Sequence, residues 1–164
     1  MYNELLDVVD QNDQVIDTVP KYQVYEQKLI NRIVHIIVVN SSGEIALQKR
    51  SMSVSYKPGA WSSSAGGHVS SGDDYETSAN RELAEEIGVQ GELTHIDKYL
   101  YTCPTTGQQK FLGIFEIEYE GEFRYEDGEV DYVEWYSLDD IKKLIEVGED
   151  FHPEMVFILE KYYF

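Results

Sequence analysis

The sequence predicts a sandwich of the α/β or α+β class, in which several strands are interspersed with two or three helices. Three observations support this fold class. Short segments rich in β-branched residues alternate with turn signals, a few segments show helical periodicity, and the composition is 42% hydrophobic. With 164 residues, the chain is long enough for a full hydrophobic core, and we expect one domain over residues 1–164.

Two hairpins are predicted in the first third of the chain. The first joins strands at 5–10 and 14–19 through a turn-like Asn-Asp pair, and the second joins strands at 32–40 and 44–50 through Ser-Ser-Gly. The strand RIVHIIVVN is typical of one buried on both faces, and His35 within it is expected to be a core histidine. Further strands are expected at 98–103, 111–121 and 132–137.

The first predicted helix begins near Asp73 and ends at Gly88. Asp73 and Glu76 have the spacing of a capping box, and glycine is the residue type that favours the left-handed position after a helix. Apolar side chains recur every four residues along this segment and form the expected buried stripe: Tyr75, Ala79, Leu83 and Ile87.

Two more helices are predicted near the C-terminus. One covers residues 138–146, with Ser137 as its cap and Asp140 at the third position. The other begins at Pro153, a residue suited to the first helical position. Its expected apolar face consists of Met155, Val156, Leu159 and Tyr162.

The net charge of −18 argues against nucleic acid as a partner, because an acidic surface repels the phosphate backbone. No apolar run is long enough to span a membrane, and the start MYNELLDVVD lacks the basic region of a secretion signal. Cys103 is the single cysteine, so no internal disulfide can form. We therefore expect a cytoplasmic protein without membrane contact, of a size that suits a monomer or a homodimer.

Acidic side chains are concentrated on the first predicted helix. Offsets of three and four residues place Glu82, Glu85 and Glu86 on one face, at the edge of the buried stripe. Like charges at this spacing repel, so the face is either simply solvated or occupied by a cation. Mg²⁺ and Mn²⁺ prefer carboxylate oxygens, and without metal at least one of these glutamates should have a raised pKa. Charge alone favours the solvated face.

The spacing around these glutamates resembles the Nudix box, G-x(5)-E-x(7)-R-E-U-x-E-E-x-G-U, where U is a bulky aliphatic residue. The chain departs from this pattern at Asp73, where the family has glutamate. The eight matching positions are Gly67, Arg81, Glu82, Leu83, Glu85, Glu86, Gly88 and Val89. The resemblance to Nudix domains covers nearly the whole chain.

This resemblance implies an α/β/α sandwich with a mixed sheet and a loop–helix–loop metal site. It implies hydrolysis of a nucleoside diphosphate linked to another group X, with Mg²⁺ or Mn²⁺ as cofactor and a small-molecule diphosphate as substrate. Arg81 would be structural and would fix the loop through Asp73. The implied metal ligands are Glu82, Glu85, Glu86 and the backbone carbonyl of Gly67.

A general base is also required for hydrolysis, and two glutamates are candidates. Glu86 is the first choice. Glu129 is the second, because its segment GEVDYVEW resembles the family's downstream Glu-Val…Trp segment. An ordinary solvated loop acid is an equally good interpretation of Glu129.

Few basic residues are available to contact the phosphates of a substrate. Arg50, at the end of a predicted strand, is the first candidate, followed by Lys49 and Lys57. The alternative interpretation of Arg50 is an ordinary surface arginine. His68, next to Gly67, is expected to line the site.

The segments LQKRS and PGAWSSSAGGHV resemble the isopentenyl-diphosphate isomerase-like branch of the family. A true isomerase needs a cysteine where this chain has Gly66, and upstream histidines where it has Tyr25 and Arg32. It also needs paired glutamates on a later strand, and the matching segment GQQKFLGIF has none. We therefore expect hydrolase chemistry on an isomerase-like scaffold. The alternatives are an isopentenyl-diphosphate isomerase and a Nudix-fold ligand-binding module without turnover.

Overall fold

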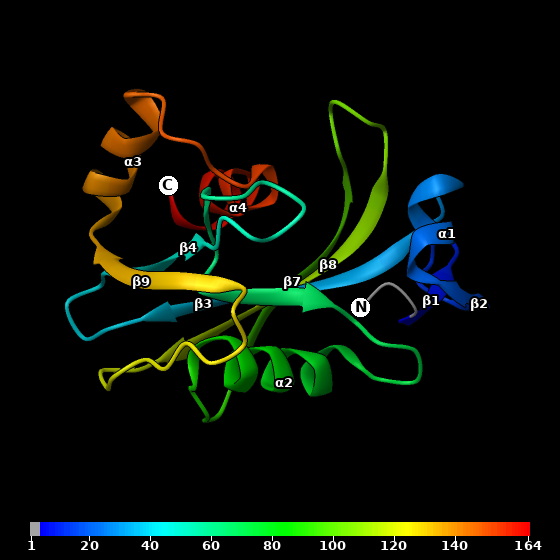
Figure 1. The fold of residues 1–164 in the computed structure, drawn as a ribbon, viewed down its shortest axis with the longest axis horizontal. Helices are drawn as coiled ribbons and strands as arrows, with labels where there is room; N and C mark the ends of the chain where they lie inside the picture. The colour runs from blue at the N-terminus through cyan, green and yellow to red at the C-terminus, as the bar shows by residue number, and fades with distance from the viewer. Residues whose placement is uncertain (1–3) are drawn as a thin grey trace.

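A mixed sheet lies between helices in the computed structural model, which describes residues 4–164 (Figure 1). Residues 1–3, the start of the stretch predicted to lack a secretion signal, lie outside the described residues. The strands of this sheet are β3 (Asn31–Val39), β4 (Ile45–Arg50), β5 (Trp61–Ser62), β6 (Ala65–His68), β7 (Thr94–Thr102), β8 (Gln109–Glu118) and β9 (Val130–Tyr136).

The strand order is β5-β4-β3-β8-β7, with β6 paired to β3 and β9 paired to β4. β3 is parallel to β8 along its whole length and antiparallel to β6, so the sheet is mixed. Helix α2 (Tyr75–Ile87) covers one face of the sheet, and α3 (Leu138–Glu146) and α4 (Pro153–Ile158) cover the other (Figure 1). A π-helical turn, η1 (Leu159–Tyr163), continues α4. The predicted sandwich class is confirmed.

Each face of the sheet has its own hydrophobic core. On the α2 face, alternate side chains of β3 pack with the stripe of α2: Val34, Ile36, Val38, Ala79, Leu83 and Ile87. On the other face, the intervening side chains of β3 pack with α3 and α4: Ile33, Ile37, Ile141, Met155, Ile158 and Leu159. β3 is therefore buried on both faces, as its apolar run predicts.

An N-terminal arm, residues 4–28, lies beside the loop that follows β6. It consists of β1 (Leu5–Val9), β2 (Val15–Pro20) and the six-residue helix α1 (Lys21–Glu26), with a small core of its own. An isolated bridge between Leu6 and Ser70 joins the arm to that loop. The hairpin was predicted from sequence, whereas α1 was not, because six residues are too few to show helical periodicity.

Two local predictions require correction. The turn between β3 and β4 forms, but these strands share only the pair Val39–Ile45, because β6 takes the adjacent edge of β3. β4 pairs instead with β9 and β5. The cap of α2 is Asp74 rather than Asp73: Asp74 accepts a hydrogen bond of 2.8 Å from the N–H of Thr77.

Among the described helices, none combines the length and the apolar character that crossing a membrane requires.

Candidate functional site

Helix α2 positions the three predicted metal ligands because its register on the sheet is fixed. Ala79, Leu83 and Ile87 are fully buried, and Gly88 ends the helix at a φ of 70°, in the left-handed region that favours glycine. The glutamates at positions 82, 85 and 86 therefore emerge along one edge of the buried stripe. Glu85 is exposed, whereas Glu86 is 5% exposed.

Glu86 is a buried carboxylate that meets only neutral hydrogen-bond donors. Its Oε1 accepts from the N–H of Gly66 at 2.9 Å and from Nε2 of Gln48 at 3.3 Å. No residue between 4 and 164 forms an ion pair with it. Burial raises the pKa of Glu86 well above its usual value, Glu82 adds to this effect and the hydrogen bond from Gly66 opposes it.

Glu82 lies directly against the backbone of Gly67. A Cβ at position 67 would be 2.6 Å from Cδ of Glu82, so a larger residue there would displace the Glu82 carboxylate from this position. Burial raises the pKa of Glu82 to about 8. Arg81, whose Nη2 is 3.9 Å from the carboxylate, opposes this shift, while Glu85 and Glu129 reinforce it. The predicted raised pKa among the helix glutamates is thus found in two of the three.

Asp73 and Arg81 form the brace that the resemblance implies. Nη1 of Arg81 donates to Oδ2 of Asp73 at 2.5 Å, and the same oxygen accepts from the hydroxyl of Ser78 at 3.0 Å. Nη2 of Arg81 also reaches Ser70 in the loop after β6, at 3.2 Å. Aspartate therefore reaches the arginine despite being one methylene shorter than glutamate.

The loop before β9 brings two further carboxylates to Glu86. One oxygen each from Glu86, Asp127 and Glu129 lie within 4.8 Å of one another. Asp127 also accepts a hydrogen bond of 3.0 Å from the N–H of Glu129, which fixes the local turn. Glu129 was a candidate from sequence and Asp127 was not, because its only signal is a place two residues earlier in an acidic stretch.

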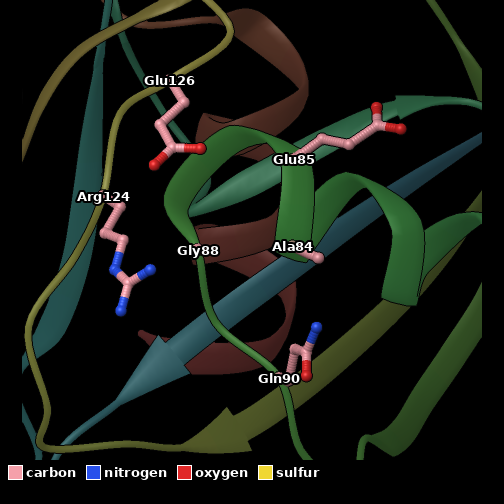
Figure 2. Close-up of a pocket in the computed structure, with 6 residues that line it drawn as sticks. All are labelled: Ala84, Glu85, Gly88, Gln90, Arg124 and Glu126. Carbon is pink, nitrogen blue, oxygen red and sulfur yellow. The ribbon is translucent and has the colours of Figure 1, made fainter.

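A small cavity of about 180 Å³ marks where this loop is attached to the end of α2 (Figure 2). The N–H of Arg124 donates to the carbonyl of Ile87 at 3.0 Å. A Cβ at Gly88 would be 2.9 Å from Cβ of Arg124, so loop and helix lie in close contact. In Figure 2 the side chain of Glu85 points away from that of Arg124, and the two form no ion pair. The contact holds the carboxylates of the loop near those of the helix.

A larger cleft of about 500 Å³ lies over the carboxylates. His68 lines it, as predicted, and burial lowers the pKa of its imidazole to about 3, with Lys21 and Lys110 adding to the effect. The complete lining is Glu4, Lys21, Gly66, Gly67, His68, Arg81, Glu82, Glu85, Asp127 and Glu129. Lys21 was not a candidate from sequence, since nothing local distinguishes it from a surface lysine.

The basic residues proposed as phosphate contacts are not among those that line the cleft. Nζ of Lys49 lies 4.5 Å from the ring centroid of Trp61, in the core region of the opposite face. Nε of Arg50 donates to the carbonyl of Tyr56 at 3.1 Å, and Lys57 pairs with Asp150 at 2.8 Å. Their predicted role at the substrate stays a prediction.

The donor set of the cleft fits a hard divalent cation. The clustered ligand atoms of Glu86, Asp127 and Glu129 are all carboxylate oxygens, and Glu82 and the backbone of Gly67 lie in the same cleft. Mg²⁺ and Mn²⁺ prefer such oxygen ligands, whereas zinc sites usually include sulfur or imidazole.

Comparison with known proteins agrees with this geometry. The NUDIX domain model matches residues 29–156. An uncharacterized Nudix hydrolase of Nostoc sp. is 30% identical over 164 residues, covering 98% of this chain and 96% of that protein. An isopentenyl-diphosphate Delta-isomerase of Serratia proteamaculans is 29% identical over 126 residues, covering 73% of this chain and 70% of that protein.

The crystal structure of DR0079 from Deinococcus radiodurans is similar in fold, with a TM-score of 0.85 and 24% identity. The structural match covers 98% of this chain and 100% of the DR0079 chain. The family match spans well over half of the sequence, and a relative with 30% identity spans nearly all of it. The chain therefore belongs to the NUDIX domain family.

Proposed function

We propose that this protein hydrolyses the diphosphate linkage of a nucleoside diphosphate linked to X, or of a similar organic pyrophosphate, with Mg²⁺ or Mn²⁺ as cofactor. The observation that carries the proposal is the buried, unpaired carboxylate of Glu86 with Asp127 and Glu129 within 4.8 Å. An unpaired buried charge and clustered like charges both cost free energy. A divalent cation would offset both costs.

In this proposal the side chains of α2 have two roles, cation binding and positioning of the loop. Glu82, Glu85 and Glu86 would hold the cation, with the carbonyl of Gly67 as a further ligand. A bound Mg²⁺ or Mn²⁺ would neutralise the diphosphate and lower the pKa of an attacking water. Arg81 would keep the loop at Gly67 in place through its bond to Asp73.

Glu86 and Glu129 are both candidates for the general base. Glu86 already accepts hydrogen bonds from Gly66 and Gln48, and it is buried. Glu129 is exposed at the cleft and lies within reach of the same ligand atoms. Glu129 is therefore the better placed of the two to take a proton from water, while Glu86 serves the cation.

Position 66 supports hydrolysis over isomerisation. A Cβ there would be 2.7 Å from the carbonyl oxygen of Val34, so a cysteine does not fit without a backbone shift. A true isomerase of the branch that this chain resembles needs the thiol of a cysteine at that position. Relatives of this chain nevertheless include proteins named isopentenyl-diphosphate Delta-isomerase, so their substrate belongs in the test.

The test is product release from a panel of diphosphates, with Mg²⁺, with Mn²⁺ and with chelator. The panel contains nucleotide sugars, dinucleoside polyphosphates, NADH, deoxynucleotides, coenzyme A and isopentenyl diphosphate. Glu86→Gln keeps an oxygen that can accept from Gly66 but removes the charge. Glu76→Gln is the matched control, because it makes the same change at an exposed position of the same helix.

Metal-dependent hydrolysis that is lost in Glu86→Gln and kept in Glu76→Gln would support the proposal. Equal hydrolysis by wild type and Glu86→Gln would contradict it. Conversion of isopentenyl diphosphate to its isomer would replace it with the isomerase function. Absence of turnover across the panel, with metal bound, would favour a ligand-binding module.

A further inference from the structure

The loop between β6 and α2, residues 69–74, connects the backbone of the cleft to the helix that carries the glutamates. It begins immediately after His68, and Gly67 lies one residue further back, so the position of the loop affects both cleft residues. The brace of Asp73 and Arg81 holds the loop to α2. The N-terminal arm, which precedes the segment matched by the family model, contacts the same loop.

Asp7, in β1, joins the arm to this loop through both of its carboxylate oxygens. Its Oδ1 accepts from the hydroxyl of Ser71 at 2.8 Å and from that of Thr18, its partner across the hairpin, at 2.9 Å. Its Oδ2 accepts from the N–H of Gly72 at 3.2 Å. Burial alone would raise the pKa of Asp7, but these hydrogen bonds lower it, so the carboxylate is charged at neutral pH and its bonds are charge-assisted.

The arm also binds the loop through its backbone and through a second acid. The N–H of Ser71 donates to the carbonyl of Leu5 at 3.0 Å, and the hydroxyl of Ser70 donates to Oε1 of Glu4 at 2.9 Å. The same hydroxyl oxygen accepts from Nη2 of Arg81 at 3.2 Å. The contacts of the arm and those of the brace therefore meet at Ser70.

The arm is itself anchored at the turn of its hairpin, independently of the loop. The side chain of Asp13 is buried there, and its Oδ1 accepts from Nε of Arg32, in β3, at 2.7 Å. Its Oδ2 accepts from Nζ of Lys98, in β7, and from the hydroxyl of Tyr75, in α2, both at 2.9 Å. The hairpin is thus tied to three elements of the main domain, so Asp7 binds the loop from a fixed position.

We propose that Asp7 is a positioning residue of the metal site, which acts through residues 69–74 to hold the backbone of Gly67 beside Glu82. Gly67 lies directly against the carboxylate of Glu82, so a displaced loop would change the distance between these two proposed ligands. Mg²⁺ demands near-ideal octahedral geometry, so such a change lowers its affinity. The inference rests on the proposed function in one respect, namely that the cleft binds Mg²⁺ or Mn²⁺.

The test is calorimetric titration of Mn²⁺ into wild type and three variants, with folding verified by circular dichroism. Asp7→Ala should weaken binding about tenfold, the lower end of the range for residues that hold metal ligands in place. Asp7→Asn removes the same charge but keeps one oxygen that can accept from Ser71, so it should bind more tightly than Asp7→Ala. Asp17→Ala is the matched control: it removes the same charge from β2 of the same arm, where the carboxylate accepts from the N–H of Thr18 at 2.8 Å.

A second measurement separates positioning through the loop from a general loss of stability. Ser71→Ala removes the hydroxyl that Asp7 holds. In that background, Asp7→Ala should weaken Mn²⁺ binding about threefold or less, because part of the connection is already lost. A tenfold loss in both backgrounds would overturn the role of the loop in transmitting the effect.

The assignment of Asp7 is overturned if Asp7→Ala binds Mn²⁺ as tightly as Asp17→Ala does, or if wild type does not bind Mn²⁺. Failure of the proposed function gives a different result. In that case Mn²⁺ would bind in an Asp7-dependent manner, while no diphosphate of the panel was turned over.

Discussion

Each face of the sheet buries one glutamate, and the two carboxylates differ in whether a cation lies beside them. Glu154, in α4, is 4% exposed and pairs with Nε2 of His35 at 2.9 Å and with Nζ of Lys110 at 3.0 Å. Glu86, in α2, is 5% exposed and meets only the N–H of Gly66 and the amide of Gln48.

The pKa values of these glutamates move in opposite directions for this reason. Burial alone would raise the pKa of Glu154, but the hydrogen bond with His35 and the charge of Lys110 hold it well below its usual value. Burial raises the pKa of Glu86, and Glu82 raises it further. A buried carboxylate with a cation in place is part of the framework, whereas one without a cation is a site prepared for a cation from solution.

The largest expected effect is on stability, from Glu154→Gln. This change leaves Lys110 buried without its counter-charge, and we expect a loss of about 3–5 kcal/mol in the free energy of unfolding. Urea unfolding followed by circular dichroism measures it. Glu86→Gln, in metal-free buffer, should leave stability unchanged or raise it, because it removes a charge that has no partner. An equal loss of stability in both variants would remove the distinction between the two faces.

The second prediction uses pH to distinguish the carboxylates of the two faces by their contributions to stability. Burial raises the folded pKa of Glu82 to about 8, above the ordinary glutamate value of 4.5. Below the unfolded value both states are protonated. Between about 4.5 and 8 the unfolded chain releases a proton that the folded chain keeps, so the contribution of Glu82 to metal-free stability should fall as pH rises, by at most about 1.4 kcal/mol per pH unit.

Glu154 has the opposite sign and a different window. Its folded pKa is depressed, so its contribution is complete above its unfolded value and is lost only as pH falls through the acidic range. Urea midpoints in chelator at pH 5, 6, 7 and 8 test the prediction. Glu82→Gln should reduce the fall in stability per pH unit. An unchanged fall in that variant would contradict the assignment of this pH dependence to Glu82.

The smallest expected effects concern the two aspartates before α2, and they refine the comparison. Asp74→Ala removes the hydrogen bond to Thr77 and should lower stability slightly without changing metal affinity. Asp73→Asn leaves that cap intact but weakens the hold on Arg81, which can then pair with Glu82 and compete with a cation. Thermal unfolding and metal titration of both variants test this division. A reversed pattern would show that the cap, not the brace, serves the site.

Much of the fold could be predicted because its signals are local. The stripe of α2 and the apolar run of β3 depend on periodicity within one segment, and both are found. The choice between Asp73 and Asp74 as cap could not be predicted, since both residues are suitable and Arg81 decides by binding the first. Helix α1 was too short to be recognised.

The site was predictable to the extent that it lies within one motif. The spacing on α2 predicted Glu82, Glu85 and Glu86 as metal ligands; in the structure Glu82 and Glu85 line the cleft, and Glu86 lies in the carboxylate cluster. Asp127 and Lys21 come from a loop and an arm distant in sequence, so only the folded chain brings them to the cleft. Lys49 was a candidate because few basic residues are available, and only the folded chain shows that the register of β4 places it over Trp61.

The most direct test of the account is calorimetric titration of Mn²⁺ and Mg²⁺ into wild type, Glu86→Gln and Glu76→Gln, with folding verified by circular dichroism. The account predicts that wild type and Glu76→Gln bind with the same affinity and that Glu86→Gln binds at least about tenfold more weakly, the loss expected when a charged ligand is removed. Equal affinity in all three proteins would contradict the claim that the unpaired carboxylate of α2 is a cation site.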